Sequence, residues 1–353
     1  MNREDRRGRR TWLQWLPGAL ISVVALFAVF RLANWSDLQL AFASIRPLNL
    51  TIAIVLTIIS LFTRALAWWT ILERKSTVPR AFFIINEGYL LNNLFPFRLG
   101  ELARAIFMGN ASGQGTFHVL STIVIERALD IIMAAGLLLA TLPLALGMDW
   151  AGPFAWLILV LVLLGLSALY LLARHHEAVQ AWVIKVGSKN RLVDRWVVPR
   201  IGSLLDGLAV MRQPRKFLQS VFWIVVSWVI WVLIYYVMLL PIAPQAKYWW
   251  SMFIDSVLAL GIAVPSAPAA LGVFEAALVG ALTLLGVNAS AALAYAIAMH
   301  FLQFVVTGIF GFWGLIRDGR SLSTLFQDVQ AQSKAINEVD SHPSGEAHDP
   351  VDL

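Results

Sequence analysis

Residues 92–101 read NNLFPFRLGE and interrupt an apolar region that extends from residue 81 to residue 108. Two amides, a proline, a glycine and a charge of each sign stand together here: Asn92, Asn93, Pro96, Arg98, Gly100 and Glu101. Proline removes a backbone donor and glycine weakens a helix, so a continuous helix is disfavoured. The stretch predicts two short helical arms joined by a polar turn, in which the asparagines satisfy backbone groups that the break leaves free.

The composition around this stretch is that of a membrane protein. Of the 353 residues, 59% are hydrophobic and only 14% are charged, and the mean hydropathy is +0.73. A membrane-spanning helix needs about 20 predominantly apolar residues. Six segments meet this requirement, at approximately 15–32, 48–72, 116–142, 153–173, 217–240 and 290–316. The sequence therefore predicts an all-α polytopic membrane protein with six full spans.

A second apolar region, residues 249–285, is broken by PSAPAALG. Its helix-breaking residues are Pro265, Pro268 and Gly272. Irregular backbone at membrane depth is tolerated only where it is buried in protein or lines a polar cavity. We therefore expect two re-entrant helical hairpins, one at each broken region.

The order of these elements repeats along the chain. Two spans, a hairpin and a span occur in about residues 15–142 and again in about 153–316. One separation recurs between the halves, from Glu101 to Glu126 and from Glu275 to His300. Inverted repeats with interrupted helices in matching positions are typical of transporters with a central site. We expect such a repeat here.

The basic residues indicate the orientation in the membrane. With the N-terminus inside, the cytoplasmic segments hold most of the 27 Lys and Arg residues, whereas the outer loops hold only Arg46 and Lys247. Short cytoplasmic loops are enriched in Lys and Arg. Both termini are therefore predicted to be cytoplasmic. Anionic lipid headgroups, rather than nucleic acid, are the expected partners of the basic loops.

Three segments lie outside the predicted transmembrane domain or between its spans. Residues 1–14 form a basic N-terminus, and residues 318–353 form a polar tail whose composition predicts disorder. The loop 174–216 combines basic residues with an apolar stripe at helical spacing. It predicts one or two amphipathic helices, which either lie on the cytoplasmic membrane surface or cover the inner face of the bundle. The transmembrane domain is expected to cover residues 15–317.

The third span contains the sequence IVIERALDII, with Glu126, Arg127 and Asp130. Each charge near the bilayer centre costs about 2.5–3.5 kcal/mol on the insertion scale, so these side chains must face the protein interior. Arg127 and Asp130 are three residues apart and can form an ion pair. The cluster either binds a ligand or holds helices together. Arg64, in the second span, is expected to be an internal ion-pair partner.

Further candidate residues flank the two breaks. Arg98 and Arg104 can bind an anion, since a guanidinium presents a planar fork that matches phosphate. Asp255 and Glu275 flank the second break, and His300 in the last span is either a helix contact or a proton relay. The candidate substrate-binding or transport residues are Asn92, Asn93, Arg98, Glu101, Arg104, Glu126, Arg127, Asp130, Asp255, Glu275 and His300.

Cofactor and metal chemistry have no recognisable motif in the sequence. The chain has no cysteine, which excludes disulfides, thiolate metal sites and a cysteine nucleophile. The glycine-rich stretch GNASGQG at 109–115 lacks the lysine of a nucleotide-binding loop and is interpreted as a turn. We expect no metal, no cofactor and no catalytic residues.

Three motifs in this order resemble the lysylphosphatidylglycerol synthase transmembrane-domain family, whose members are also called flippase-like domain proteins. They are N-x-x-P-x-R-x-G-E from Asn93, E-R-x-x-D from Glu126 and P-x-x-P-x-x-x-G-V-F-E from Pro265. The resemblance covers about residues 12–317. It implies a membrane domain of the kind associated with moving aminoacylated phosphatidylglycerol across the bilayer, although many stand-alone members have no assigned substrate.

The chain departs from the family pattern in two respects. Ala269 and Ala270 stand where the family usually carries a glycine pair, which is expected to stiffen the second hairpin. The soluble aminoacyl-transferase domain of the synthase has no counterpart in the polar tail, so aminoacylation is not expected.

These observations favour a lipid transporter or flippase of the bacterial inner membrane. It would move a phospholipid or glycolipid with a polar headgroup through a charged cavity between the two hairpins. Two alternatives stay open: an intramembrane enzyme or accessory protein in phospholipid or lipid-linked sugar metabolism, and a small-solute or ion transporter. Assembly into a homo-oligomer also stays open.

Overall fold

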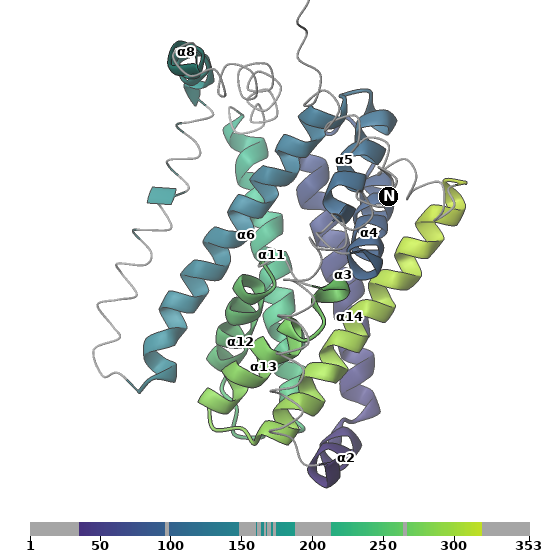
Figure 1. The fold of residues 1–353 in the computed structure, drawn as a ribbon, viewed down its shortest axis with the longest axis vertical. Helices are drawn as coiled ribbons and strands as arrows, with labels where there is room; N and C mark the ends of the chain where they lie inside the picture. The colour runs from purple at the N-terminus through teal and green to yellow at the C-terminus, as the bar shows by residue number, and fades with distance from the viewer. Residues whose placement is uncertain are drawn as a thin grey trace, which may run out of the picture.

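The computed structural model describes residues 35–95, 99–147, 174–187, 213–263 and 267–319, with a few further residues between 160 and 171. These described residues form helices joined by turns, without a β-strand (Figure 1). The N-terminus, the first predicted span, nearly all of the fourth, most of the loop 174–216 and nearly all of the tail lie outside the described residues.

Among the described helices, four are long and apolar enough to cross a membrane. They are α3 (Pro47–Ile71), α6 (Thr116–Ala145), α11 (Pro214–Leu239) and α14 (Ala289–Arg317). Proline in the first turn suits the start of α3 and α11, because the first backbone donors of a helix have no intrahelical acceptor. These helices coincide with four of the six predicted spans, with boundaries shifted by a few residues.

Both predicted breaks separate shorter helices. The first lies between α4 (Val78–Leu94) and α5 (Leu99–Ser112), and the second lies between α12 (Tyr248–Gly261) and α13 (Val273–Leu284), with a short 3-10 turn, η2 (Pro268–Ala270). At 1.5 Å per residue, α12 and α13 are each about 20 Å long, shorter than the ~30 Å hydrocarbon core of a bilayer. Two further helices are described, α2 (Trp35–Ser44) and α8 (His176–Gly187).

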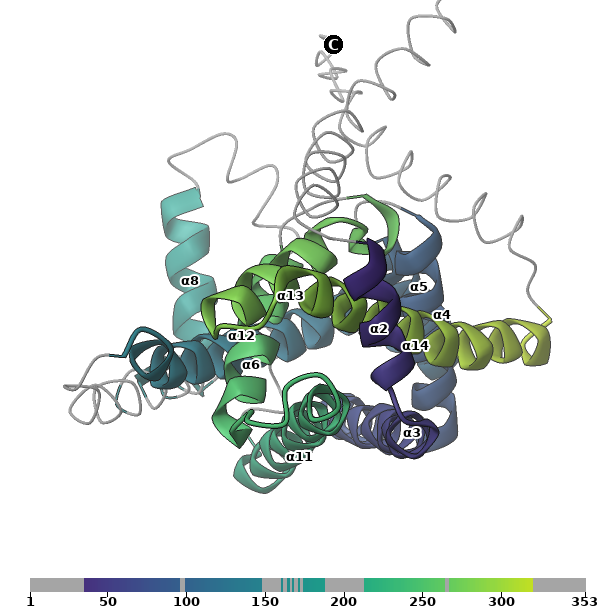
Figure 2. The same cartoon turned by 90° about the horizontal axis from the view of Figure 1, so that it is seen from below.

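The two broken pairs lie at opposite ends of the bundle. Figure 1 shows α4 and α5 toward the upper end and α12 and α13 toward the lower end, with the long helices running past both. Helix α11 packs along α3, α14 packs on α4, and α12 packs on α6 (Figure 2). Large apolar side chains on the outer faces are exposed, as expected for helices that face lipid: Val55, Phe62, Val229, Phe301, Ile309 and Phe312.

Two glycines allow α4 and α5 to cross closely. A Cβ atom on Gly100 would lie 1.8 Å from the carbonyl oxygen of Gly88, and one on Gly88 would lie 2.5 Å from Cγ of Arg104. The backbone N–H of Gly100 donates to Oδ1 of Asn92 at 2.8 Å. Asn92 therefore satisfies a backbone group at the break, as predicted. Asn93 differs, because its side-chain amide donates to Oγ1 of Thr307 on α14 at 3.3 Å.

The second break contains two alanines in the left-handed region. Ala269 has φ 56° and Ala270 has φ 54°, a conformation that costs a residue with a Cβ atom about 1–2 kcal/mol. Gly272 follows with φ 83°, and its N–H donates to Oε2 of Glu275 at 2.7 Å, which caps the start of α13. Glycine adopts such backbone angles at no steric cost. Ala269 and Ala270 thus occupy backbone positions that glycine would adopt without this strain.

Candidate functional site

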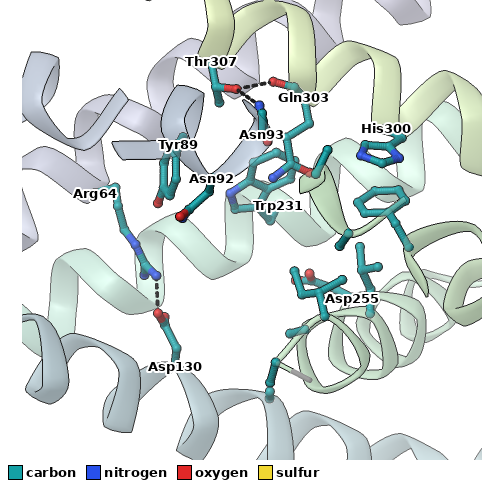
Figure 3. A pocket seen from close by; sticks show the side chains of 18 of the residues that line it. Arg64, Tyr89, Asn92, Asn93, Asp130, Trp231, Asp255, His300, Gln303 and Thr307 are labelled. Carbon is teal, nitrogen blue, oxygen red and sulfur yellow. Dashed lines mark hydrogen bonds and ion pairs between the residues drawn. The ribbon is translucent and has the colours of Figure 1, made fainter. Parts of the chain in front are cut away.

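A cavity of about 390 Å³ lies between the two broken helix pairs. Its lining includes Asn92 and Asn93 of the first pair and Asp255, Ala269 and Ala270 of the second, together with side chains from α3, α6, α11 and α14 (Figure 3). This volume is within the usual range of small-molecule sites, about 300–1,000 Å³. The cavity is therefore large enough for a small polar molecule or group.

A buried carboxylate organises one wall of the cavity. Glu126 on α6 is fully buried. Its Oε1 lies 3.0 Å from Nε of Arg64 on α3 and 3.3 Å from Nη2 of Arg127, and its Oε2 lies 2.7 Å from Nη2 of Arg104 on α5. One carboxylate thus joins three helices through three guanidinium groups.

Asp130, one helical turn after Glu126, extends this ion cluster. It forms an ion pair with Arg64 and lies 3.4 Å from Nη1 of Arg127, and its Oδ1 accepts a hydrogen bond from Nε1 of Trp228 on α11 at 3.1 Å. Glu101 lies 3.6 Å from Nε of Arg127. The predicted pair of Arg127 and Asp130 is confirmed. The role of Arg64 as an internal ion-pair partner is confirmed as well, and Figure 3 shows its contact with Asp130.

Arg104 lines the same cavity with part of its hydrogen-bonding capacity unused. The residue is 1% exposed, and its guanidinium lies over the ring of Trp68 at 4.3 Å. Nη2 donates to Glu126, but the buried Nε and Nη1 atoms have no hydrogen-bond partner in the part of the chain that the structure describes. Buried donors are rarely left without an acceptor, so an anion or water molecule in the cavity is the natural partner.

The opposite wall carries a different set of polar groups. Figure 3 shows Asp255 and His300 on the side of the cavity away from Arg64 and Asp130. Asp255 is 8% exposed, and its Oδ2 atom is buried without a hydrogen-bond partner among the described residues. His300 lies 2.6 Å from Oε1 of Glu275 through Nδ1. Its ring stacks on Phe274 with the ring centres 4.2 Å apart.

Most of the predicted site residues meet at this cavity. The lining includes Asn92, Asn93, Glu101, Arg104, Arg127, Asp130, Asp255 and His300. Glu126 and Glu275 are not among the lining residues, but they contact Arg104 and His300, which are. Of the predicted helix breaks, Gly100, Pro268 and Gly272 are described, whereas Pro96 and Pro265 lie outside the described residues, as does Arg98.

Several lining residues were missed in the sequence. Trp228, Trp231 and Tyr235 on α11 line the cavity, as does Tyr89 on α4. The three aromatic residues of α11 recur at positions i, i+3 and i+7, which places them on one helix face. That spacing could have predicted that these three aromatic side chains of α11 line the cavity together. Arg64, expected to be an internal ion-pair partner, also lines the cavity.

The family assignment rests on a match over most of the chain. The family described as lysylphosphatidylglycerol synthase TM region matches residues 15–311 of the 353 residues. A search of curated proteins found no match to this chain. The match, together with four long apolar helices, identifies a multi-pass membrane protein with a lipid-related function. The chain belongs to the lysylphosphatidylglycerol synthase transmembrane-region family.

Proposed function

We propose that this protein is a lipid transporter, a flippase that moves a lipid with a polar headgroup between the leaflets of the bacterial inner membrane. The two broken helix pairs are re-entrant hairpins in this proposal, and they enter from opposite sides of an inverted repeat with six full spans and cytoplasmic termini. Their positions at opposite ends of the bundle support such an arrangement (Figure 1). A central cavity lined by both pairs is where a transporter of this design binds its substrate.

The observation that carries the proposal is that Arg104 has hydrogen-bond donors without an acceptor among the described residues. Three arginines and three carboxylates surround this wall of the cavity, and their ion pairs offset much of the cost of placing charge in a membrane. Arg104 still has two buried donors without a partner in the described residues. A guanidinium stays charged in such a site and matches the oxygens of a phosphate. Both donor atoms are buried in this structure, so a phospholipid headgroup would supply that acceptor once alternating access opens the cavity toward Arg104.

The size of the cavity limits what enters it. A volume of about 390 Å³ accommodates a headgroup, so the acyl chains would stay in the lipid phase while the headgroup crosses. Arg64 and Arg127 are held by Glu126 and Asp130 and would keep the wall in shape. Arg104 would bind the phosphate, with Asn92 and Asn93 at the neighbouring break.

Reconstitution of the full chain into vesicles tests this function. The vesicles contain phosphatidylethanolamine and phosphatidylglycerol with a trace of either lipid carrying an NBD label, and dithionite quenching reports the label in the outer leaflet. We expect wild-type protein to accelerate exchange between leaflets for at least one label, and Arg104→Gln to slow it about tenfold or more. The control Arg46→Gln removes an exposed arginine at the start of α3 and should leave the rate unchanged.

Two results would reject the proposal. One is exchange no faster than in protein-free vesicles for both labels. The other is an Arg104→Gln variant as fast as the wild type. Thermal unfolding in detergent accompanies both variants, so that loss of folded protein is recognised separately from loss of transport.

A further inference from the structure

The carboxyl group of Asp255 is the one cavity carboxyl for which the described residues supply no cation. Glu101, Glu126 and Asp130 each lie within 4.0 Å of an arginine nitrogen. Asp255, on α12, has no ion pair with any described residue, and its Oδ2 atom is buried without a hydrogen-bond partner there. A buried carboxylate without a compensating partner is costly, so this position calls for a positive ligand.

The groups that face Asp255 from neighbouring helices do not supply that charge. Asp130 on α6 repels it, and Arg64 on α3 attracts it but is engaged by Glu126 and Asp130. The phenols of Tyr235 on α11 and Tyr295 on α14 are within electrostatic range. The hydroxyl of Tyr295 donates to the backbone carbonyl of Tyr235 at 2.8 Å and is therefore engaged elsewhere.

The remaining ionisable groups near this wall are also paired. Glu275 is the only ionisable residue of α13, and it is bonded to the N–H of Gly272 and to His300 of α14. Arg127, on α6, contacts Glu101, Glu126 and Asp130. Asp255 thus stands alone in a cavity whose other described charges compensate one another.

We propose that Asp255 is the proton-binding residue that couples lipid movement to the proton gradient, an inference that rests on the proposed transport function. A hydronium ion that enters the cavity from one side transfers its proton to Oδ2, which gives a neutral carboxylic acid and water. When the cavity opens to the other side, water takes the proton and the carboxylate is restored. Arg104 and the ion cluster bind the headgroup, while Asp255 on the opposite wall carries the proton.

The burial of Oδ2 of Asp255 favours a proton over a headgroup amine as the positive ligand. The Oδ2 atom that lacks a partner is itself buried, with less than 1 Å² accessible. A proton binds to such an atom without entering as a hydrated group, whereas an ammonium group needs room for its own donors and their acceptors.

The first test is an imposed pH difference across the vesicles described above. Wild-type exchange of the labelled phosphatidylglycerol should become several-fold faster with the gradient than without it. Asp255→Asn should show the same rate under both conditions, and Asp255→Glu, which keeps a carboxyl group, should respond. The matched control Asp37→Asn changes an exposed aspartate on α2 and should respond as the wild type does.

The second test detects the proton directly and does not depend on transport. Infrared spectra of the purified chain with ¹³C-labelled aspartate should show the carbonyl band of a protonated carboxylic acid, which Asp255→Asn lacks and Asp37→Asn retains.

Lipid exchange by the wild type without any response to the gradient would overturn the proton coupling and leave the transport function standing. The band without exchange of either label would have the opposite meaning, because it would reject lipid transport and retain the proton site. Loss of exchange for the ethanolamine lipid alone in Asp255→Asn, with the gradient response kept for the glycerol lipid, would show that Asp255 binds the headgroup amine and that the proton proposal is wrong.

Discussion

Glu275 and His300 join the second broken helix pair to α14. Nδ1 of His300 lies 2.6 Å from one carboxylate oxygen of Glu275, and the other oxygen accepts the N–H of Gly272 at the start of α13. One side chain therefore caps a helix and fixes the neighbouring helix at the same time. The stacking of His300 on Phe274 adds a second contact between the same two helices.

This relationship predicts that the two side chains contribute to stability as a unit. Glu275→Ala should lower the free energy of unfolding by about 2–4 kcal/mol, since it removes a helix cap and a hydrogen bond to a carboxylate. His300→Ala removes the same bond from the other side. In the double variant the loss should fall short of the sum of the two single losses by about 1–2 kcal/mol. Unfolding by denaturant in detergent micelles provides the measurement.

A matched cycle checks that the coupling is specific. Asn288→Ala removes the N-cap of α14, whose side chain accepts from the N–H of Ser290 at 2.8 Å, one end of the same helix as His300. Because Asn288 and His300 share no hydrogen-bond partner among the described residues, this pair should be additive. Additive losses for Glu275 and His300 would contradict the arrangement described here.

The sequence identified features that depend on neighbours along the chain. Proline and glycine disfavour the interior of a helix, so both breaks were placed correctly from NNLFPFRLGE and PSAPAALG. The pair of Arg127 and Asp130 is local too, since it spans one helical turn.

Contacts between helices were harder to predict, because the choice of partner depends on packing. The sequence spacing does not show that Arg104 forms an ion pair with Glu126. It also does not show that Arg127 contacts Glu101, Glu126 and Asp130 at once. The left-handed alanines were not foreseen either. Both lie in the short turn η2, where their backbone angles are opposite to the preference of alanine.

The close crossing of α4 and α5 predicts that alanine at Gly100 is destabilising, in contrast to alanine at an uncrowded glycine of another helix. Gly100→Ala places a Cβ atom 1.8 Å from the carbonyl oxygen of Gly88, which only a shift of the backbone relieves. We expect a loss of more than about 3 kcal/mol or failure to fold, beyond the usual cost of overpacking. Gly280→Ala, at a helical position with open space, should instead gain up to about 1 kcal/mol. Denaturant unfolding of both variants measures the change in the free energy of unfolding. Equal changes for Gly100→Ala and Gly280→Ala would refute the close crossing.

The ion cluster predicts a large penalty for neutralising its central carboxylate. Glu126→Gln leaves the guanidinium groups of Arg64, Arg104 and Arg127 with less negative charge in a buried site. Removing one partner of a buried ion pair costs about 3–5 kcal/mol. Glu101→Gln serves as the comparison, because Glu101 is 24% exposed and lies 3.6 Å from Arg127, so its loss should cost about 1 kcal/mol or less. Similar losses for the two variants in thermal unfolding would argue against Glu126 as the centre of the cluster.

The two alanines of the second break predict a stabilising substitution. Glycine relieves about 1–2 kcal/mol of strain at each left-handed position but adds about 0.4–1 kcal/mol of unfolded-chain entropy, so the relief is the larger effect. Ala269→Gly with Ala270→Gly should therefore raise the free energy of unfolding by about 1–2 kcal/mol. Ala298→Gly, in the interior of α14, should lower it by about 1 kcal/mol or more, because glycine weakens the helix and removes a methyl group that packs against the core. Denaturant unfolding of both variants separates the two signs, and destabilisation by the double substitution would mean that the alanines are not strained.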